Sequence, residues 1–507
     1  MVTINKRSIG VSILLSIITL GVYGVYWQYL LVKNIKAIKH DTSSCITEML
    51  CIIFVPFYLL YWWYTRGDVV KGEFSKRNHS VTSNGTMLFI LSLFGLGVVA
   101  MAIMQNDFNS LSSSSHSEQL NVVSESANAS RFMQNYGIVI AFIFVLVFFI
   151  WGTEGGILLP MNVNSIIHQN AYVFILATGM LLCILTGGNI DLSVGATMAL
   201  VAAIGATLIS NHNVPVVVAM VVMVLSGIVI GMWQGFWIAY VRIPPFIVTL
   251  AGMLTFRGLT NIVLGGLSVS MPDAYTRLFN AWIPDIFNGT NFNITAIVIG
   301  VIVVSIAFIS SLVGRIKRSK KGYEVGSLIG FLVKAVIISG IVMAVTIRLS
   351  QFRGIQVVVI WIAVVVLVYW YITSKTTIGR HFYAVGGNEK AAKLSGINTN
   401  RVYFIAYVNM SFLAAIAGMV FSARVSAAFP NLGSGFELHA IASCFIGGAS
   451  AYGGIGTVPR VILGASLMGI INLGMASMGF DQNQQNVISG LVLLGAVIFD
   501  VLSKRKA

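Results

Sequence analysis

The sequence contains few charged residues. Asp, Glu, Lys and Arg make up 9% of its 507 residues, whereas 57% are hydrophobic. This composition excludes an ordinary soluble protein and indicates a chain embedded in lipid. Stretches such as residues 192–241 and 286–314 carry no charge at all. A helix crosses the hydrocarbon core with about 20 apolar residues, so these stretches are long enough for one or two spans each.

Cysteine is also scarce. The four cysteines, Cys45, Cys51, Cys183 and Cys444, lie in or near apolar segments and do not have the spacing of metal ligands. We therefore expect them to be packing residues, with neither a metal site nor a disulfide.

Acidic residues are half as frequent as basic ones, 16 against 31, which gives a net charge of +15. In a soluble protein this excess would favour nucleic-acid binding. Here the basic residues gather in short loops between apolar segments, as expected when positive charge is retained on the cytoplasmic side of a membrane. We therefore expect a lipid bilayer as the surroundings and no nucleic acid as a partner.

The region beyond residue 130 is predicted to be all-α and polytopic, with about twelve apolar segments. They are roughly residues 135–152, 170–187, 192–210, 216–238, 246–266, 294–312, 326–346, 355–372, 402–424, 436–450, 458–478 and 485–502. With Arg131 in the cytoplasm, the loops on that side carry fifteen Lys and Arg residues and the opposite loops carry three. This asymmetry predicts an even number of spans and a cytoplasmic C-terminus.

A Ser-rich stretch divides the chain. Residues 106–130 cannot form a buried core and are predicted to be a flexible linker. It separates an N-terminal membrane module, residues 1–105, with three short apolar segments, from the large membrane domain, residues 131–507. The first apolar stretch is too long for a signal peptide and lacks a cleavage site, so we expect it to be retained.

The N-terminal module contains an internal aromatic repeat. Tyr23, Tyr26, Trp27 and Tyr29 recur 35 positions later as Tyr58, Tyr61, Trp62 and Tyr64. Tyr and Trp at this density favour the membrane interface. Two re-entrant hairpins, bent near Gly21 and Pro56, and two ordinary spans are both compatible with the basic residues that flank each copy.

The longest cytoplasmic loop of the large domain, residues 373–401, predicts a short helix outside the membrane. Asn388 can cap a helix that runs from Glu389 to Leu394, and Gly396 can end it. Such a short helix needs a surface to pack against. On these residues alone, a groove of a partner protein and the lipid headgroups are both possible surfaces.

Four blocks of the sequence form a recognisable pattern. They are residues 187–195 (GGNIDLSVG), 243–253 (IPPFIVTLAGM), 379–397 (GRHFYAVGGNEKAAKLSGI) and 445–456 (FIGGASAYGGIG). In this order, the blocks resemble those of ribose- and xylose-type ABC importer permeases, and within that group they are most similar to the multiple-monosaccharide subfamily. In the N-terminal module, Thr19, Gly21, Tyr23, Tyr26 and Trp27 are similar to the repeated elements of small bacterial membrane domains of unknown function, a resemblance that implies no activity.

The resemblance implies a permease subunit of an ATP-binding cassette importer for a monosaccharide, in the plasma (inner) membrane of a prokaryote. It also implies three partners: an ABC ATPase subunit bound to residues 373–401, an extracytoplasmic sugar-binding protein, and a second permease chain in a homodimer. The expected ATPase-coupling residues are Gly379, Arg380, Gly387, Asn388, Glu389, Ala391, Ala392 and Gly396.

The Gly-rich stretch from Gly447 to Gly456 lacks the Lys-Ser or Lys-Thr ending of a Walker motif. These glycines are predicted to allow tight helix contacts or a broken helix along the pathway. ATP would therefore be bound and hydrolysed by the partner, and we expect neither a cofactor nor an enzymatic activity in this chain. Two departures from the family pattern, His439 in place of a carboxylate and Arg460 in place of a small or apolar residue, leave substrate detail and transport competence open.

Candidate pathway residues are the polar, ionisable and aromatic side chains in or near the spans. A sugar has many hydroxyls and little charge, so its path should offer amides, hydroxyls and aromatic faces. The candidates are Asn189, Asp191, Trp233, Gln234, Arg257, Glu437, His439 and Asn472. Asp191 is predicted to cap the next helix, with a proton relay as the alternative. For Arg257, Glu437 and His439, structural and pathway roles are equally compatible with the sequence, whereas Lys334 and Arg460 are expected to snorkel to the interface.

Two other classes of transporter stay open. An ion-coupled secondary transporter would need protonatable or ion-coordinating groups at the midplane of broken helices, and the spans offer few. An ABC permease for nucleosides or branched amino acids would share similar Gly-rich segments.

Overall fold

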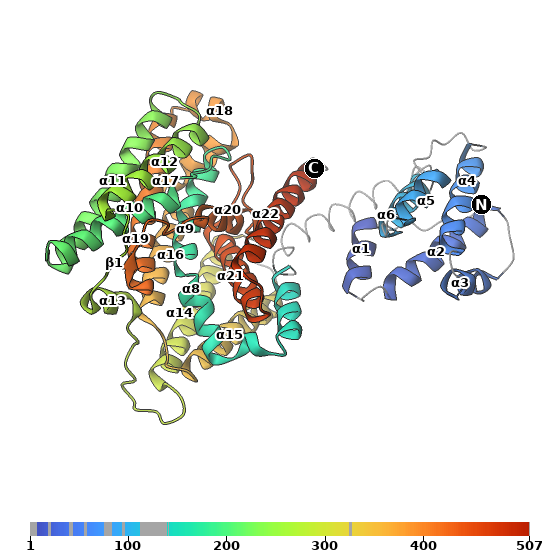
Figure 1. Ribbon diagram of the computed structural model, residues 1–507. Coiled ribbons are helices and arrows are strands. Elements are labelled where there is room, and N and C mark those ends of the chain that lie inside the picture. The colour runs from blue at the N-terminus through green and yellow to red at the C-terminus, as the bar shows by residue number, and fades with distance from the viewer. Residues whose placement is uncertain are drawn as a thin grey trace. The chain divides into compact units, whose positions relative to one another are not determined.

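The computed structural model describes residues 8–18, 22–39, 44–54, 58–75, 84–93, 97–111, 139, 141–323 and 327–505. Contacts divide the chain into two units, Met1–Gly137 and Ile138–Ala507 (Figure 1). Helix α6 (Gly97–Leu111) continues past residue 106, where the sequence predicted the linker to start. The rest of that predicted linker lies outside the described residues.

Six helices form the described part of the N-terminal unit. They are α1 (Ile9–Ile18), α2 (Val22–Lys39), α3 (Cys45–Phe54), α4 (Tyr58–Ser75), α5 (Gly85–Leu93) and α6. The aromatic repeat corresponds to two pairs of helices, each a 10-residue apolar helix followed by an 18-residue helix. The bends predicted near Gly21 and Pro56 lie outside the described residues. Within residues 8–111, no described helix is a candidate membrane span.

The two tryptophans of the repeat lie in the core of the N-terminal unit, not at its surface. Trp27 and Trp62 are buried, and both indole N–H groups donate hydrogen bonds. The acceptor for Trp27 is the side-chain oxygen of Gln105, at 3.2 Å, and the acceptor for Trp62 is the carboxylate of Glu48, at 2.7 Å. Arg66 also pairs with Glu48, at 2.8 Å, so this buried carboxylate has the partners that it needs.

The larger unit is almost entirely helical, as predicted. Its helices are Ala141–Gly152, the 3-10 turn η2 (Gly156–Leu158), α8 (Pro160–Gln169), α9 (Ala171–Leu185), α10 (Val194–Ala206), the π-helical turn η3 (Thr207–Asn211), α11 (Val216–Ala239), α12 (Pro245–Leu264), α13 (Asp273–Asn280), α14 (Ile294–Lys320), α15 (Leu328–Ser350), α16 (Val357–Lys375), α17 (Thr377–Gly387), α18 (Glu389–Leu394), α19 (Thr399–Val425), α20 (Phe436–Ile446), α21 (Val458–Ser477) and α22 (Gln482–Arg505). Two short strands, β1 (Val269–Ser270) and β2 (Ala427–Ala428), pair antiparallel, with Val269 opposite Ala428.

Eight described helices are long and apolar enough to cross a membrane, and a ninth span results if α8 and α9 are counted as one bent helix. The chain is therefore a multi-pass membrane protein. Each of the twelve predicted apolar segments overlaps a helix, but the helices do not reach twelve spans by length and composition. Helix α20, for example, has 11 residues and is about 16 Å long, so it cannot cross a core of about 30 Å by itself.

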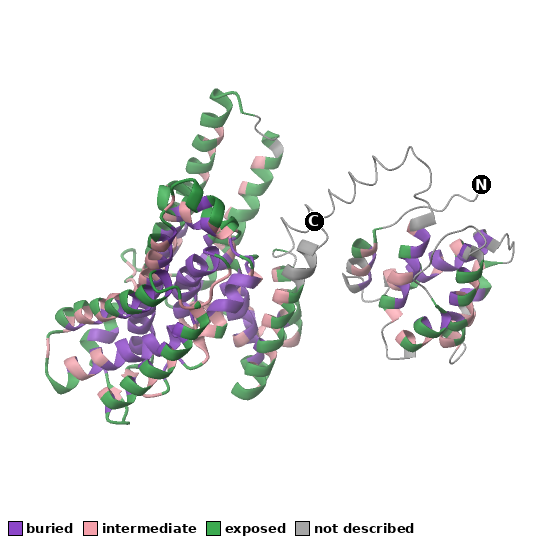
Figure 2. Cartoon of the chain, turned by 90° about the horizontal axis from the view of Figure 1, so that it is seen from above, coloured by how far each residue is buried: buried purple, intermediate pink, exposed green. Residues whose placement is uncertain are grey.

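Helices α9 and α19 form the centre of the larger unit. All 15 residues of α9 are buried, and 72% of the most apolar stretch of α19 is buried. Figure 2 shows the buried residues gathered in the middle of the larger unit. Three glycines of α11, spaced four residues apart, face α19: Gly227, Gly231 and Gly235. Small residues at this spacing let two helix backbones approach closely in lipid. Close packing of α9 and α11 on α19 thus forms the centre of the larger unit.

Candidate functional site

The short helix predicted in the loop of residues 373–401 is present as α18, with the predicted bounds. The side chain of Asn388 accepts a hydrogen bond from the N–H of Ala391 at 3.0 Å, which is the predicted N-cap. Gly396 has a φ of 83°, a left-handed conformation that ends a helix at little steric cost only in glycine. The sequence missed the preceding helix, α17, which Thr376 caps through its hydroxyl.

One face of α18 is directed away from the protein. Leu394 is 91% exposed, and Lys390, Ala391 and Lys393 are also exposed, whereas Ala392 is buried against the larger unit. Leu394 therefore offers apolar surface to a partner, and burying a leucine side chain is worth about 1.5–3 kcal/mol. From the sequence, Leu394 was predicted only as the last residue of this helix.

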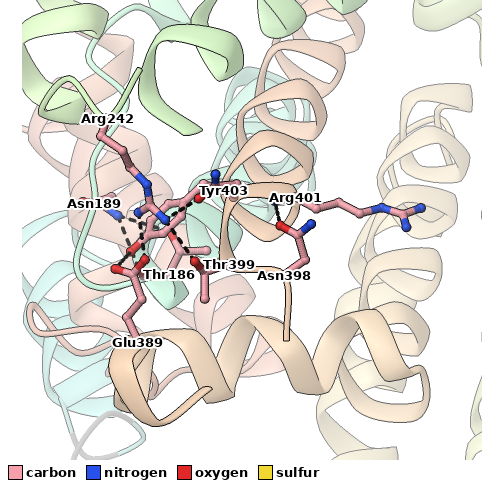
Figure 3. Close-up of polar contacts among 9 residues, drawn as sticks. Thr186, Asn189, Arg242, Glu389, Asn398, Thr399, Arg401 and Tyr403 are labelled. Carbon is pink, nitrogen blue, oxygen red and sulfur yellow. Dashed lines mark hydrogen bonds and ion pairs between the residues drawn. The ribbon is translucent and has the colours of Figure 1, made fainter. Parts of the chain in front are cut away.

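Arg242, in the loop between α11 and α12, clamps the start of α18 (Figure 3). Its guanidinium forms an ion pair with Glu389 at 2.7 Å, donates to the hydroxyl of Thr399 at 3.0 Å and also donates to the side chain of Asn400. It lies 5.2 Å from the centre of the Tyr403 ring, within the range of a cation–π interaction. Three structural segments, the α11–α12 loop, α18 and the start of α19, are therefore joined at one side chain.

Glu389 is held by two donors at once. The hydroxyl of Tyr403 donates to its second carboxylate oxygen at 3.1 Å, and Arg242 binds the first. Partial burial raises the pKa of Glu389, but the hydrogen bonds from Arg242 and Tyr403 outweigh it, so the pKa lies below its usual value. Asn189 lies beside these side chains and donates to the hydroxyl of Thr186 at 3.3 Å (Figure 3). The structure thus places Asn189 next to Glu389, one of the predicted coupling residues.

At Gly386, near the end of α17, the backbone of this loop lies directly against two other segments of the larger unit. A Cβ atom there would lie 2.5 Å from the backbone nitrogen of Gly454 and 2.9 Å from the carbonyl carbon of Leu185, and closer still to the carbonyl oxygen of Leu185. The N–H of Gly454 donates to that same oxygen at 3.1 Å. We call the contact among Leu185, Gly386 and Gly454 the glycine junction.

The glycine junction explains why glycine-rich blocks far apart in the sequence occur together. The junction joins the end of α9, the end of α17 and the loop between α20 and α21, and Tyr383 adds a hydrogen bond of 2.8 Å to the carbonyl of Gly456. Since Arg242 immediately precedes the second block (residues 243–253), all four blocks meet around α17 and α18. The sequence predicted tight contacts for Gly447 to Gly456 but could not say with which segments.

The other predicted coupling residues differ in their surroundings. Gly379 is buried, and its N–H is bound by the cap of α17, whereas Arg380 and Gly387 are exposed. No atom lies within 4 Å of the position that a Cβ of Gly387 would take. Arg380 and Gly387 therefore lie at the surface without a structural contact that explains them.

Asp191 and Gln234 belong to one buried network. One carboxylate oxygen of Asp191 accepts from the backbone N–H and the hydroxyl of Ser193, at 2.8 and 2.7 Å, and the amide of Gln234 donates to the same hydroxyl at 2.6 Å. Ser193 is the residue from which α10 starts. Asp191 therefore binds the N-cap residue of α10, Ser193, and does not itself occupy the predicted cap position.

Arg257 and Glu437 form a second polar region, between α12 and α20. Arg257 is half-buried and donates to the carbonyl of Leu432 at 2.6 Å, and Glu437 is within electrostatic range of it. The carboxylate of Glu437 lies against Gly195 of α10. No ion pair between the two side chains occurs among the described residues, so both keep polar atoms for another ligand.

His439 joins an aromatic cluster that the sequence did not predict. The hydroxyl of Tyr172 lies 3.0 Å from Nδ1 of His439, and the ring of Tyr172 stacks on Phe436, with 3.9 Å between ring centres. Arg424 lies 5.8 Å from the ring centre of Phe421, which packs edge-on against Phe436. His439 is therefore a partner of Tyr172 in this conformation.

Trp233 and Asn472 are not joined to either polar region. Trp233 is 42% exposed on α11 and packs edge-on against Phe256, and Asn472 is half-buried in α21. Arg460, the second departure from the family pattern, is half-buried in the first turn of α21. Among the described residues, no group of three His, Cys, Asp or Glu side chains could hold a metal ion.

Comparisons with known proteins agree with this architecture. Residues 162–497 match the family described as the permease component of branched-chain amino acid transport systems. Residues 7–57 match a domain of unknown function (DUF4234), which covers only the first part of the N-terminal module. No solved structure matches the chain.

Several curated relatives cover most of the larger unit. The xylose transport system permease protein XylH of Escherichia coli (strain K12) is 33% identical over 377 residues, which are 74% of this chain and 93% of the relative. XylH of Haemophilus influenzae is 35% identical over 379 residues, 74% of this chain and 98% of the relative. The ribose import permease protein RbsC of Bacillus subtilis (strain 168) is 32% identical over 383 residues, 76% of this chain and 98% of the relative.

Proposed function

The chain belongs to the family of permease components of branched-chain amino acid transport systems, and on this premise we propose that it is the monosaccharide permease of an ATP-binding cassette importer. The similarity to xylose and ribose permeases over 93% or more of the length of three relatives favours a sugar over a branched amino acid. Because XylH and RbsC are similar to the same degree, the similarity supports a monosaccharide without selecting one.

The observation that carries the proposal is the exposed, capped helix α18, held rigidly to the rest of the larger unit. In the proposed complex, an ATPase subunit buries Leu394 and the neighbouring exposed face of α18 in a groove. A coupling helix must be held by contacts with the transport helices. Without such contacts, the movement of the ATPase would displace only the loop and would not be transmitted to those helices. Arg242 and the glycine junction provide that attachment on two sides of the loop.

Movement of the ATPase would then pass through two routes. The glycine junction passes it from α17 to the end of α9 and to the loop before α21, since no side chain separates these backbones. The Arg242 clamp passes it to the α11–α12 loop and to the start of α19. Helices α9 and α11 each pack closely on α19, so we expect displacement at α18 to move the centre of the larger unit.

For the translocation path, the exposed fractions exclude Asp191 and Gln234, and among the other candidates we favour the polar region of Arg257 and Glu437 and the exposed ring of Trp233. A sugar can reach a side chain only where some of it is open, and these three are exposed or half-exposed, whereas Asp191 and Gln234 are fully buried. In the proposed path, Arg257 and Glu437 bind sugar hydroxyls and Trp233 offers an aromatic face. Asp191 and Gln234 hold the start of α10 in place.

The proposed assembly contains two permease chains, two copies of the ATPase subunit and an extracytoplasmic sugar-binding protein. The charge asymmetry of the loops supports a cytoplasmic position for α17, α18 and the C-terminus, and this is the side on which an ATPase has access to ATP. The role of the N-terminal unit is not part of this proposal.

Uptake and ATP hydrolysis, measured together in cells that express the complete importer, test the proposal. We expect Glu389→Ala or Gly396→Val to abolish sugar uptake while the chain still inserts and the ATPase still turns over. Lys317→Ala, an exposed cytoplasmic control at the end of α14, should leave uptake unchanged. Normal uptake in the Glu389 and Gly396 variants would refute the role of the loop.

An ion-coupled transporter is the rival function, and it predicts a different dependence on energy. Collapse of the ion gradient at constant ATP would then stop uptake, whereas an importer driven by ATP should continue. Competition by nucleosides or branched amino acids, but not by xylose or ribose, would instead point to a related importer with a different substrate.

A further inference from the structure

A groove with a volume of about 540 Å³ lies between α14 and α15, beside the last residue of α16. Four basic side chains line it: Arg315 and Arg318 from α14, Lys334 from α15 and Lys375 from α16. We call it the basic groove. None of its described lining residues is acidic, and Glu324, in the connection between α14 and α15, lies outside the described residues.

The four cations gather at the same end of three apolar helices. Arg315 and Arg318 lie near the end of α14, Lys375 is the last residue of α16, and Lys334 lies six residues into α15, about 9 Å along the helix axis. A lysine at that depth keeps its ammonium group near the headgroups by extending along the helix. These positions correspond to the boundary between the hydrocarbon and the headgroups on the side that the charge count assigns to the cytoplasm.

The cations have few partners within the protein. In the described part of the chain, Arg318, Lys334 and Lys375 form no ion pair. Arg315 lies 5.5 Å from the centre of the Phe331 ring, which holds its guanidinium at the wall of the groove. Arg318, Lys334 and Lys375 carry like charges and repel one another, so an anion in the groove would stabilise them.

The remainder of the groove is apolar. Only 11% of the most apolar stretch of α14 and 6% of that of α15 are buried, the lowest fractions among the candidate spans, and the larger unit carries a projecting pair of mostly exposed helices (Figure 2). A second groove of about 350 Å³ adjoins the first and shares Phe308, Ala335 and Ser339 with it. The second groove has no charged lining residue. One charged groove and one apolar groove thus lie side by side.

We propose that the basic groove binds one anionic phospholipid of the cytoplasmic leaflet. Its phosphate lies among Arg315, Arg318, Lys334 and Lys375, and its acyl chains extend along the apolar walls of the two grooves. Basic pockets between transmembrane helices at this level of the membrane recognise anionic headgroups. Arginine suits a phosphate because its guanidinium can donate two parallel hydrogen bonds.

A second copy of the chain is a poorer occupant. A two-fold arrangement that placed groove on groove would bring a second set of four cations against the first. A phospholipid supplies both the negative charge and the apolar chains that the two grooves offer. The proposal does not depend on the transported substrate.

Lipid binding to the purified full-length chain in detergent tests this assignment. The probes are dioleoylphosphatidylglycerol, dioleoylphosphatidylcholine and inorganic phosphate, with binding counted by native mass spectrometry. The groove variant is Arg318→Gln with Lys334→Gln. Its matched control, Lys317→Gln with Lys320→Gln, removes the same charge from the same end of α14 outside the groove lining.

We expect phosphatidylglycerol to bind more tightly than phosphatidylcholine and to resist competition by phosphate. Each basic residue near an anionic lipid is worth roughly fivefold in affinity, so the groove variant should lose roughly 30-fold and the control variant little. Equal losses in both variants, equal binding of the two lipids, or displacement of the lipid by inorganic phosphate would overturn the proposal. So would a groove variant that changes only the oligomeric state.

Discussion

Adding one methyl group at Gly386 should separate the coupling loop from the transport helices. In Gly386→Ala, the new Cβ would lie 2.5 Å from the nitrogen of Gly454, whereas carbon atoms approach backbone polar atoms no closer than about 3.3 Å. Helix α17 must therefore move by about 1 Å or more away from the end of α9 and the loop before α21. The hydrogen bond of 3.1 Å from Gly454 to Leu185 joins the two segments from which α17 moves, so it stays in place.

The expected cost follows from these contacts. Overpacking a tight contact costs about 1–3 kcal/mol, and we expect a loss of stability of this size. Gly387→Ala is the matched control, because it adds the same methyl group one residue later, where no atom lies within 4 Å. Alanine also favours a helix over glycine, so the control should be neutral or slightly stabilising.

Two readouts separate a loss of coupling from a loss of folding. Thermal unfolding of the purified chain reports the stability of each variant, and sugar uptake by the complete importer reports coupling. We expect Gly386→Ala to unfold at a lower temperature and to lose uptake about 5-fold to 100-fold, while Gly387→Ala unfolds at the temperature of the parent protein. If the two variants behave alike, the glycine junction does not transmit movement.

Three further perturbations test other parts of the site. Leu394→Asp should weaken binding of the ATPase subunit about 10-fold to 100-fold in a co-purification titration, because it removes about 1.5–3 kcal/mol of apolar burial. The control is Leu328→Asp, at an exposed position at the start of α15, which should have little effect on this binding. Equal losses in the two variants would contradict docking at α18. Arg242→Ala and Glu389→Gln, combined in a double-mutant cycle of unfolding free energies, should show a coupling of about 0.5–1 kcal/mol, since the pair is about 40% exposed and partly screened by solvent. The pKa of Glu389 is lowered in the folded protein, so the coupling energy between Arg242 and Glu389 should be constant from neutral pH to about pH 5. It should be lost as the pH falls through the lowered pKa. A coupling energy that disappears near pH 6.5 would point to another titrating group. Asp191→Asn keeps an oxygen that can accept from Ser193, so uptake should persist, whereas Asp191→Ala should impair it; loss of uptake in Asp191→Asn with normal folding would favour a proton relay instead.

Features set by neighbouring residues could be predicted from the sequence. Helix α18, its Asn388 cap and its end at Gly396 depend on residues within one or two turns, and all three predictions are confirmed. The all-α membrane fold followed in the same way from long uncharged stretches. The count of twelve spans is not confirmed, because eight described helices are long and apolar enough to cross, or nine if the bent pair α8 and α9 is one span.

The contacts that connect the site could not be predicted, because they join residues far apart in the sequence. Arg242 and Glu389 are 147 positions apart, and Tyr172 and His439 are 267 apart. In a single sequence, Arg242 contributes only one positive charge to a cytoplasmic loop. Gly386 lies in the block of residues 379–397, which resembles the corresponding block of the permease family. Its contact with Leu185 depends on how α9 and α17 pack together, and this packing could not be predicted from the sequence.

Crosslinking from residue 394 is the most direct test of the central claim that α18 docks on an ATPase. The importer is assembled with a chain whose native cysteines are replaced and which carries Leu394→Cys, and a bifunctional thiol–amine reagent is added. Leu328→Cys, also exposed and on the side assigned to the cytoplasm, provides the control. We predict a crosslink from position 394 to the ATPase subunit and none from position 328. A functional importer that yields no crosslink at position 394, or that crosslinks equally at both positions, would contradict the account.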